Sequence, residues 1–390
     1  MRVLALGGAG TYGRLTAAVL APSDLVSEIV IAGRDLHAAE KLARELGEKA
    51  VAAQVDVVDE DQLAALGADC DLMVNTAGPE FKVVLPALRA AIRAGTDYCD
   101  LCALGPITEQ ALALDVAARE AGVTAVVGTG FFALTGPMMV HAARQLDEPE
   151  EVRSCWYVPA PIWGYEPRET LAGWRELGHA DMSWQCMMAQ VAGKVRVYRD
   201  GGWTDVDPLE DAVQVRLPHG AEVTAYPGAL PEPVTVPRTL TGIRSVSAVT
   251  SFFPPEICEA YCGYGRRIAT GELDESQAAF AFFEYLATRP DESPPRPEGG
   301  ETGIIWTEAI GTKDGRRVCR KCWPAGDWDS TQGPLAAVAF TILRGEIGAR
   351  GVVAPEACLD PLPFFAEAAQ YGYEKPKGDK LLEEYVETLE

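Results

Sequence analysis

The chain has 390 residues, of which 48% are hydrophobic and 23% are charged, and its formal net charge is −23. This length exceeds the usual size of one hydrophobic core, so we expect two domains in a globular protein. No apolar run approaches the ~18 residues that span a bilayer, and the acidic charge disfavours nucleic acids and anionic membranes as partners. The chain enters a strand directly, without a signal-peptide pattern, which predicts a cytoplasmic location.

The negative charge has two interpretations. It is either a solvated acidic surface that aids solubility, or a field that attracts cationic substrates such as amines.

The ten cysteines are expected to be free thiols, because no secretion signal accompanies them. Cys99 and Cys102, like Cys319 and Cys322, have the spacing of zinc ligands. Residues three apart on a strand face opposite sides of the sheet, so we predict no metal site.

The first element is a short apolar strand, Val3–Leu6, followed by a G-x-G-x-x-G sequence and a helix over Arg14–Leu20. Strand, glycine turn and helix form the context in which this motif binds a dinucleotide. Gly8 permits the tight turn, Gly10 lets the backbone approach a pyrophosphate, and Gly13 lets the helix pack closely. The helix amino terminus faces the anion. The predicted cofactor contacts here are Gly8, Gly10, Thr11, Tyr12 and Gly13. The alternative is a tight turn without a nucleotide.

Strands and helices then alternate with short links, which is typical of a parallel α/β sheet. The predicted strands are Glu28–Ala32, Val51–Val55, Leu72–Val74, Asp97–Leu101 and Val123–Val127. The predicted helices are Leu36–Leu46, Asp59–Leu66, Phe81–Arg93 and Thr108–Glu120. We therefore expect a Rossmann-like, doubly wound domain over residues 1–132.

From Val152 onward the chain is rich in aromatic residues, prolines and hairpin signals. Strands are predicted over Val195–Tyr198, Ala212–Leu217, Ser245–Phe253, Ile304–Ile310 and Arg317–Cys322, and helices over Gln277–Leu286, Leu335–Leu343 and Phe364–Tyr371. The proline-rich stretch Arg289–Gly300 is expected to be a surface loop. The pattern predicts an inserted α+β substrate domain over residues 133–350 and a segment over 351–390 that returns to the first domain.

Arg34 ends the second predicted strand, where a Rossmann domain meets the adenosine ribose. An arginine there favours the 2′-phosphate of NADP(H), and Asp35 is placed to cap the next helix. The alternative is that Arg34 stacks on the adenine edge and either NADP(H) or NAD(H) is accepted.

The fourth predicted strand ends at Asn75-Thr76-Ala77-Gly78-Pro79, at the sheet edge where ligands bind in open α/β folds. We expect these five residues to contact the cofactor; the alternative is a chain reversal alone. Gly130, after the sixth strand, is expected to lie under the nicotinamide or to serve as a hinge.

Tyr98 and Asp100 close the fifth strand at the same edge, on one face of the sheet. A carboxylate there could orient a substrate amine or accept its proton, so both residues are candidates for catalysis. The alternative is that Asp100 caps the following loop.

Aromatic and basic residues gather in the second domain, and we predict that they bind substrate. They are Trp163, Tyr165, Arg168, Trp174 and Arg175, with His179 nearby. A dimer interface uses the same residue types and is the alternative. His37, His141, His179 and His219 form no catalytic triad or metal-ligand pattern.

These motifs together resemble the saccharopine dehydrogenase-like family, which includes saccharopine reductases, carboxynorspermidine dehydrogenases and, as relatives, L-lysine 6-dehydrogenases. The resemblance rests on Gly8–Gly13, Ala32–Arg34, Asn75–Phe81, Ala94–Leu101, Gly128–Gly136, Pro233–Arg238 and Gly351–Glu356. It implies an inserted domain that forms a homodimer, and nicotinamide chemistry at a C–N bond in amino-acid metabolism. The residues after Asp100 and from Gly164 to Trp174 depart from the family pattern, so the resemblance does not name a substrate.

Three functions follow as hypotheses. The first is an NADP-dependent oxidoreductase of the CH–NH class, which condenses an amine with an aldehyde and reduces the imine, or runs in reverse. The second is a lysine-type oxidative deaminase or an enoyl reductase. The third is a non-catalytic NADP-binding sensor, suggested by the lack of a clear proton donor.

Overall fold

We describe a computed structural model of the chain, which covers residues 1–130, 133–218, 220–289, 295–326, 331–372 and 380–389. Phe131 and Phe132 of the Gly128–Gly136 motif, His219 and residues 290–294 of the proline-rich stretch lie outside these residues. The chain forms two compact units. Unit 1 comprises Met1–Pro137 and Pro324–Leu381, and unit 2 comprises Met138–Trp323 and Leu382–Glu390.

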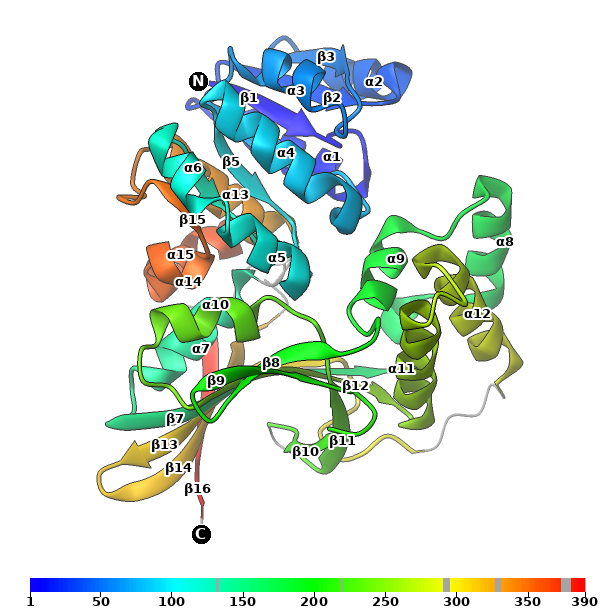
Figure 1. Ribbon diagram of the computed structural model, residues 1–390, viewed down its shortest axis with the longest axis vertical. Coiled ribbons are helices and arrows are strands. Elements are labelled where there is room, and N and C mark those ends of the chain that lie inside the picture. The colour runs from blue at the N-terminus through cyan, green and yellow to red at the C-terminus, as the bar shows by residue number, and fades with distance from the viewer. Residues whose placement is uncertain (131–132, 219, 290–294, 327–330, 373–379, 390) are drawn as a thin grey trace. The chain divides into compact units, whose positions relative to one another are not determined.

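Unit 1 contains a seven-stranded parallel sheet in the order β15-β6-β5-β4-β1-β2-β3 (Figure 1). Its strands are β1 (Arg2–Leu6), β2 (Glu28–Gly33), β3 (Ala50–Gln54), β4 (Leu72–Asn75), β5 (Asp97–Asp100), β6 (Thr124–Val126) and β15 (Gly351–Val353). Val3 to Leu6 are all buried, so β1 is covered on both faces, as a strand inside a doubly wound sheet must be. The predicted Rossmann-like fold is confirmed.

The helices of unit 1 are α1 (Thr11–Leu20), α2 (Leu36–Leu46), α3 (Glu60–Gly67), α4 (Glu80–Ala94), α5 (Gly105–Leu112), α6 (Asp115–Glu120), α13 (Gln332–Leu343), α14 (Pro355–Cys358), α15 (Pro361–Ala368) and the 3₁₀ turn η3 (Ala369–Tyr371), while α7 (Thr135–Ala143) crosses the unit boundary. Several helices of unit 1 pack on this sheet, whereas α15 and η3 pack on α13. The predicted bounds of α2 are confirmed. The prediction of one helix over Thr108–Glu120 is wrong, because the chain breaks between α5 and α6, where Asp115 Oδ1 accepts a hydrogen bond from Val352 N at 3.0 Å.

Unit 2 contains a nine-stranded sheet in the order β10-β11-β12-β7-β13-β14-β16, with β8 paired to β12 and to β9. Its strands are β7 (Glu148–Pro159), β8 (Val195–Arg199), β9 (Gly202–Val206), β10 (Val213–Arg216), β11 (Glu222–Pro227), β12 (Ser245–Phe253), β13 (Ile304–Lys313), β14 (Arg316–Pro324) and β16 (Leu382–Thr388). Strands β7 and β12 run parallel, whereas β7 and β13 are antiparallel, so the sheet is mixed. The predicted bounds of β12 are confirmed.

An aromatic core joins one end of this sheet to four helices of unit 2. These helices are α8 (Pro167–Leu177), α9 (Met182–Ala189), α11 (Glu256–Ala269) and α12 (Glu275–Thr288), and unit 2 also contains η2 (Ile162–Gly164) and α10 (Glu232–Thr239). Trp184, Phe282 and Phe283 are each at most 1% exposed at the centre of this core. The helices are therefore held by ring packing.

The two units differ from the predicted domains in two elements. Helix α13 falls within the predicted inserted domain but packs in unit 1, against α1 and the β4–β5 part of the sheet. Strand β16 falls within the predicted returning segment but joins the sheet of unit 2. Within the described residues, no helix is both long enough and apolar enough to cross a membrane.

Candidate functional site

The glycine turn between β1 and α1 is closely packed. Gly7 has a left-handed φ of +66°, and a Cβ there would lie 2.7 Å from the Ala77 Cα. The turn therefore requires its left-handed residue at Gly7, one position before the predicted Gly8. A Cβ at Gly13 would lie 2.2 Å from the Gly7 carbonyl oxygen and 2.7 Å from Thr76 Oγ1. The predicted close packing of the helix at Gly13 is confirmed.

The outer side of this turn can accept an anion. A Cβ at Gly10 would meet only the Gly7 carbonyl oxygen, at 3.1 Å. Gly10 is the N-cap residue of α1 and has no side chain that could cap the helix. Unsatisfied N–H groups at a helix start favour a phosphate, so the turn fits the pyrophosphate of a dinucleotide.

The turn after β4 is bonded to the glycine turn. The Thr76 N–H and hydroxyl both donate to the Leu6 carbonyl, at 2.9 and 2.7 Å. Asn75 Oδ1 accepts from Ala77 N at 3.1 Å, and Gly78-Pro79 then leads into α4. The structure thus places the predicted residues Asn75 to Pro79 beside the glycine turn, at the carboxyl edge of the sheet.

Arg34 directly follows β2 and is exposed. Its guanidinium makes no hydrogen bond or ion pair with any residue that the structure describes, and its carbonyl accepts from Gln54 Nε2 at 2.9 Å. Asp35 accepts from Ala38 N at 3.0 Å and caps α2, as predicted. The cation at the end of β2 therefore remains available for a ligand phosphate, whereas the neighbouring carboxylate already has a partner.

Asp100 lies at the end of β5 and is fully buried. Its Oδ1 accepts from Cys102 N at 2.9 Å and from Gly128 N at 2.8 Å, so it ties together the loops after β5 and β6. Burial raises the pKa of Asp100 to about 6, although the two N–H groups oppose the shift. Asp100 therefore caps the following loop through Oδ1, as the alternative prediction had it. Its Oδ2 is buried without a hydrogen-bond partner among the described residues.

Tyr98 is also fully buried and shares a face of β5 with Asp100. Its hydroxyl accepts from Asn75 Nδ2 at 3.0 Å. Burial raises its pKa well above the ordinary tyrosine value, so the hydroxyl stays protonated. It also lies near Asp100 and lowers the pKa of that carboxyl, although Oδ2 itself receives no hydrogen bond. The two candidate catalytic residues therefore lie together, linked to the turn after β4 through Asn75.

Glu80 is a second acid at this edge, and the sequence did not single it out. It is the first residue of α4, and its Oε2 accepts from Ala103 N at 2.7 Å. Burial raises the pKa of Glu80 to about 8, and the charge of Asp100 adds to the shift, whereas the bond from Ala103 opposes it. The signal in the sequence was an acidic residue directly after Gly78-Pro79, but its burial depends on the distant loop after β5.

Gly130 lies in the loop that Asp100 holds. The Thr129 N–H and hydroxyl both donate to the Asp100 carbonyl, at 2.8 and 2.6 Å. A Cβ at Gly130 would lie 3.0 Å from Leu101 Cδ2. The loop after β6 therefore packs against the loop after β5, at the same edge of the sheet.

Three of the predicted substrate residues in unit 2, Trp163, Tyr165 and Trp174, pack on the same aromatic core but differ in exposure. Trp174 is 4% exposed, and its ring centroid lies 4.6 Å from that of Phe283, so it packs in the core and is poorly placed to contact a substrate. Trp163 is 46% exposed, has a φ of 49°, and its ring lies tilted against Trp184.

Tyr165 is half-buried, and its ring also packs against Trp184. Arg175 pairs with Glu284 at 3.2 Å. Arg168 is exposed and makes no ion pair with any described residue. Trp163, Tyr165 and Arg168 therefore remain accessible, whereas Trp174 serves the core.

The histidines and cysteines add no catalytic or metal site in the described residues. His141 pairs with Glu384, and His179 Nδ1 lies 2.9 Å from the Ala180 carbonyl oxygen. All ten cysteines are free, and no group of three or more candidate ligands for a metal ion occurs among the residues described.

A family model described as the saccharopine dehydrogenase NADP binding domain matches residues 3–126, which contain the glycine turn, Arg34, Glu80 and Asp100. The chain also superposes on apo saccharopine dehydrogenase (L-Glu forming) from Saccharomyces cerevisiae, with a TM-score of 0.62 over 99% of both chains. The identity in that superposition is 18%, so it shows the shared fold. Residues 3–126 therefore match the NADP-binding domain of the saccharopine dehydrogenase-like family, and the whole chain shares the fold of that yeast enzyme. This confirms the resemblance seen in the motifs.

The curated relatives of this chain are named as enoyl reductases. A Mycobacterium tuberculosis protein, provisionally named a trans-acting enoyl reductase, is 30% identical over 151 residues, which cover 37% of this chain and 36% of the relative. The trans-acting enoyl reductase of Mycobacterium leprae is 33% identical over 102 residues, covering 25% of this chain and 24% of the relative. These matches span about a third or less of the curated relatives.

Proposed function

We propose that this protein is an NADP-dependent oxidoreductase that acts on a C–N bond of an amino-acid-derived substrate. In the reductive direction an amine and an aldehyde would condense to an imine, which is reduced to a secondary amine. The observation that carries the proposal is the arrangement at the carboxyl edge of the parallel sheet. There the glycine turn follows β1, the turn after β4 leads into the half-buried Glu80 of α4, and the buried Asp100 ends the adjacent strand β5.

The cofactor would be held by residues already positioned in this structure. The turn from Gly8 to Gly13, with Thr11 and Tyr12 at the start of α1, would receive the pyrophosphate. Arg34 would pair with the 2′-phosphate, which favours NADP(H) over NAD(H). When bound, the cofactor supplies or accepts the hydride.

The remaining residues of this edge would manage a proton. With pKa values of about 8 and about 6, Glu80 and Asp100 would together hold one proton near neutral pH. A protonated Glu80 could donate to the hydroxyl of the amine–aldehyde adduct, so that the C–O bond breaks, water leaves and the protonated imine forms. Asp100 and Tyr98 would set the charge and polarity around that proton. Glu80 and Asp100 would thus supply the proton donor whose absence from the sequence motifs suggested a non-catalytic sensor.

The substrate would be bound in part by the accessible residues of unit 2. Arg168 has the planar fork that suits a substrate carboxylate, and Trp163 and Tyr165 offer ring faces. Homodimer formation and a cytoplasmic location remain predictions from the sequence.

The test is a scan of amino acids, polyamines and aldehydes, alone and in amine–aldehyde pairs, for oxidation or reduction of the nicotinamide. We expect NADPH oxidation with an amine–aldehyde pair and little with either partner alone. Tight NADPH binding without turnover of any amine would instead support the sensor. Ammonia release from lysine would support an oxidative deaminase.

The second candidate is an enoyl reductase, favoured by the names of the curated relatives. Reduction of a conjugated C=C bond adds a hydride to one carbon and a proton to the other, so the same acid pair could serve. Saturation of an unsaturated thioester with NADPH, without turnover of amine–aldehyde pairs, would select this candidate.

A further inference from the structure

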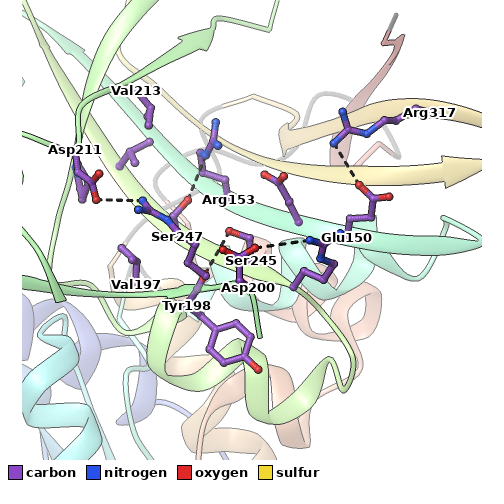
Figure 2. A pocket seen from close by; sticks show the side chains of 15 residues that line it. Glu150, Arg153, Val197, Tyr198, Asp200, Asp211, Val213, Ser245, Ser247 and Arg317 are labelled. Atoms are coloured by element: carbon purple, nitrogen blue, oxygen red, sulfur yellow. Dashed lines mark hydrogen bonds and ion pairs between the residues drawn. The ribbon is translucent and has the colours of Figure 1, made fainter. Parts of the chain in front are cut away.

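A pocket of about 490 Å³ lies on unit 2, on one face of the nine-stranded sheet (Figure 2). Residues of β7 and β12 line it together with β8 and the segment that leads into β10. Its volume falls in the range of small-molecule sites. None of the residues considered above for cofactor or substrate binding lines it.

Most charges in this pocket neutralise one another. Eight charged side chains line it, four acids and four arginines. Three pairs form within the lining: Arg199 with Asp211 at 3.1 Å, Arg317 with Glu150 at 3.2 Å, and Arg244 with Asp200 at 3.7 Å. Figure 2 shows the pair of Arg317 and Glu150 at one side of the pocket. An anionic ligand would have to displace one of these carboxylates.

The other two charged residues differ from each other. Arg153 donates from Nε to Ser247 Oγ at 3.2 Å and pairs with Glu308, outside the pocket, at 3.4 Å. Glu151 makes no hydrogen bond or ion pair with any residue in the described part of the chain. The residue is half-buried in the lining of the pocket. The pocket therefore carries one unbalanced negative charge.

Strand register places Glu151 beside suitable groups. It lies opposite Ser245 on β12, and the next pair on this face is Arg153 with Ser247. Val213 is half-buried and supplies apolar surface in the same pocket, which Val197 and Val249 line from below at 3% and 1% exposure. An unpaired carboxylate with apolar surface nearby matches an ammonium group on an alkyl body. A divalent metal ion would need more oxygen ligands, and no such group occurs among the residues described.

We propose that this pocket is a binding site for a small primary amine, whose ammonium group pairs with Glu151 and whose alkyl body lies against Val213. The net charge of −23 favours the approach of such a cation. This site is separate from the proposed cofactor edge, which belongs to unit 1. If the negative charge of the chain attracts amines, this pocket is the place where we expect them to bind.

The test is calorimetric titration of the full chain with n-butylamine, compared with its neutral analogue 1-butanol and with methylamine. We expect butylamine to bind at least about tenfold more tightly than 1-butanol, because only the ammonium pairs with Glu151, and more tightly than methylamine, because of the apolar contacts. Glu151→Gln should weaken butylamine by at least about tenfold, and added salt should weaken binding to the wild type.

Two further variants complete the test. Glu176→Gln removes an exposed carboxylate on α8, outside the pocket, and should leave the affinity unchanged. Val213→Thr keeps the side-chain shape and should reduce the affinity for butylamine more than that for methylamine. No measurable binding of butylamine to the wild type, or equal affinity in Glu151→Gln, would overturn the proposal, and the melting temperature of each variant reports whether it folds.

Discussion

Asp100 and Glu80 accept hydrogen bonds from consecutive backbone N–H groups. Asp100 Oδ1 accepts from Cys102 N at 2.9 Å, and Glu80 Oε2 accepts from Ala103 N at 2.7 Å. One loop after β5 thus holds two acids, one from the end of β5 and one from the start of α4. Asp100 is buried and Glu80 is half-buried, and the charge of Asp100 raises the pKa of Glu80, so ionising one raises the cost of ionising the other. The protonation of this pair is therefore the first property of the site to test.

The pair predicts a pH dependence of stability. Glu80 has an ordinary pKa of 4.5 and a pKa of about 8 in the folded chain. The folded chain keeps its proton where the unfolded chain has lost it, so the stabilising effect of this group is complete below pH 4.5 and is lost as the pH rises to about 8. Glu80→Gln keeps an acceptor for Ala103 N, so it should stabilise the protein by about 1–3 kcal/mol at pH 8 and by less at pH 5. Denaturant unfolding at the two pH values measures this.

Glu120→Gln, which changes an exposed residue of α6, is the control. An equal effect of Glu80→Gln at both pH values would contradict a raised pKa of Glu80.

Arg34→Ala should weaken NADPH binding by about 10- to 100-fold and change NADH binding little, because only NADPH carries the 2′-phosphate. Fluorescence titration with both cofactors measures this. Arg44→Ala, an exposed cation on α2, should change neither affinity. An equal loss for NADPH and NADH would remove the assignment of NADP.

Gly13→Ala should abolish cofactor binding and lower the melting temperature, because the new Cβ would meet the Gly7 carbonyl oxygen at 2.2 Å. Backbone atoms cannot yield as the end of a side chain does, so we expect a loss of more than about 2 kcal/mol of stability. Gly173→Ala in α8 is the matched control, since a Cβ there meets nothing within 4 Å. Retained NADPH affinity in Gly13→Ala would show that the turn does not contact the cofactor.

Trp174→Ala and Trp163→Ala should differ in their effect on stability, because Trp174 lies in the core and Trp163 is exposed. Removing the buried Trp174 ring should cost about 3–5 kcal/mol in the free energy of unfolding. Removing the exposed Trp163 ring should cost less than half as much and, if this ring contacts substrate, should raise KM at constant stability. Chemical unfolding of both variants, followed by steady-state kinetics of Trp163→Ala, provides the measurements. Similar losses of stability would contradict the distinction.

The Rossmann-like part of the fold could be predicted because its signals are local. Short apolar runs and glycines mark each strand and turn, and α2 has the predicted bounds because Asp35 and Gly47 cap it. Long-range packing could not be predicted. Asp115, which bonds Val352 at the break between α5 and α6, lies far from it in the sequence, and α13 carries no mark of the unit it joins.

Some residues of the candidate site could also be predicted from local signals, whereas others depend on long-range packing. The residues of the glycine turn, Arg34 and Asn75 follow from their places at strand ends. The importance of Glu80 does not, because its pKa depends on burial against the loop after β5. Trp174 looked like a pocket residue because tryptophan is common in both pockets and cores, and only the packing of α8 on α12 distinguishes them.

The most direct test of the central claim is an isotope-transfer experiment. The protein is incubated with NADPH deuterated at the transferable position and with amine–aldehyde pairs, alongside an unsaturated thioester, and the products are analysed by mass spectrometry. The proposal predicts a secondary amine that carries deuterium on the carbon of the new C–N bond. Deuterium found only in the saturated thioester, or in no product at all, would contradict it.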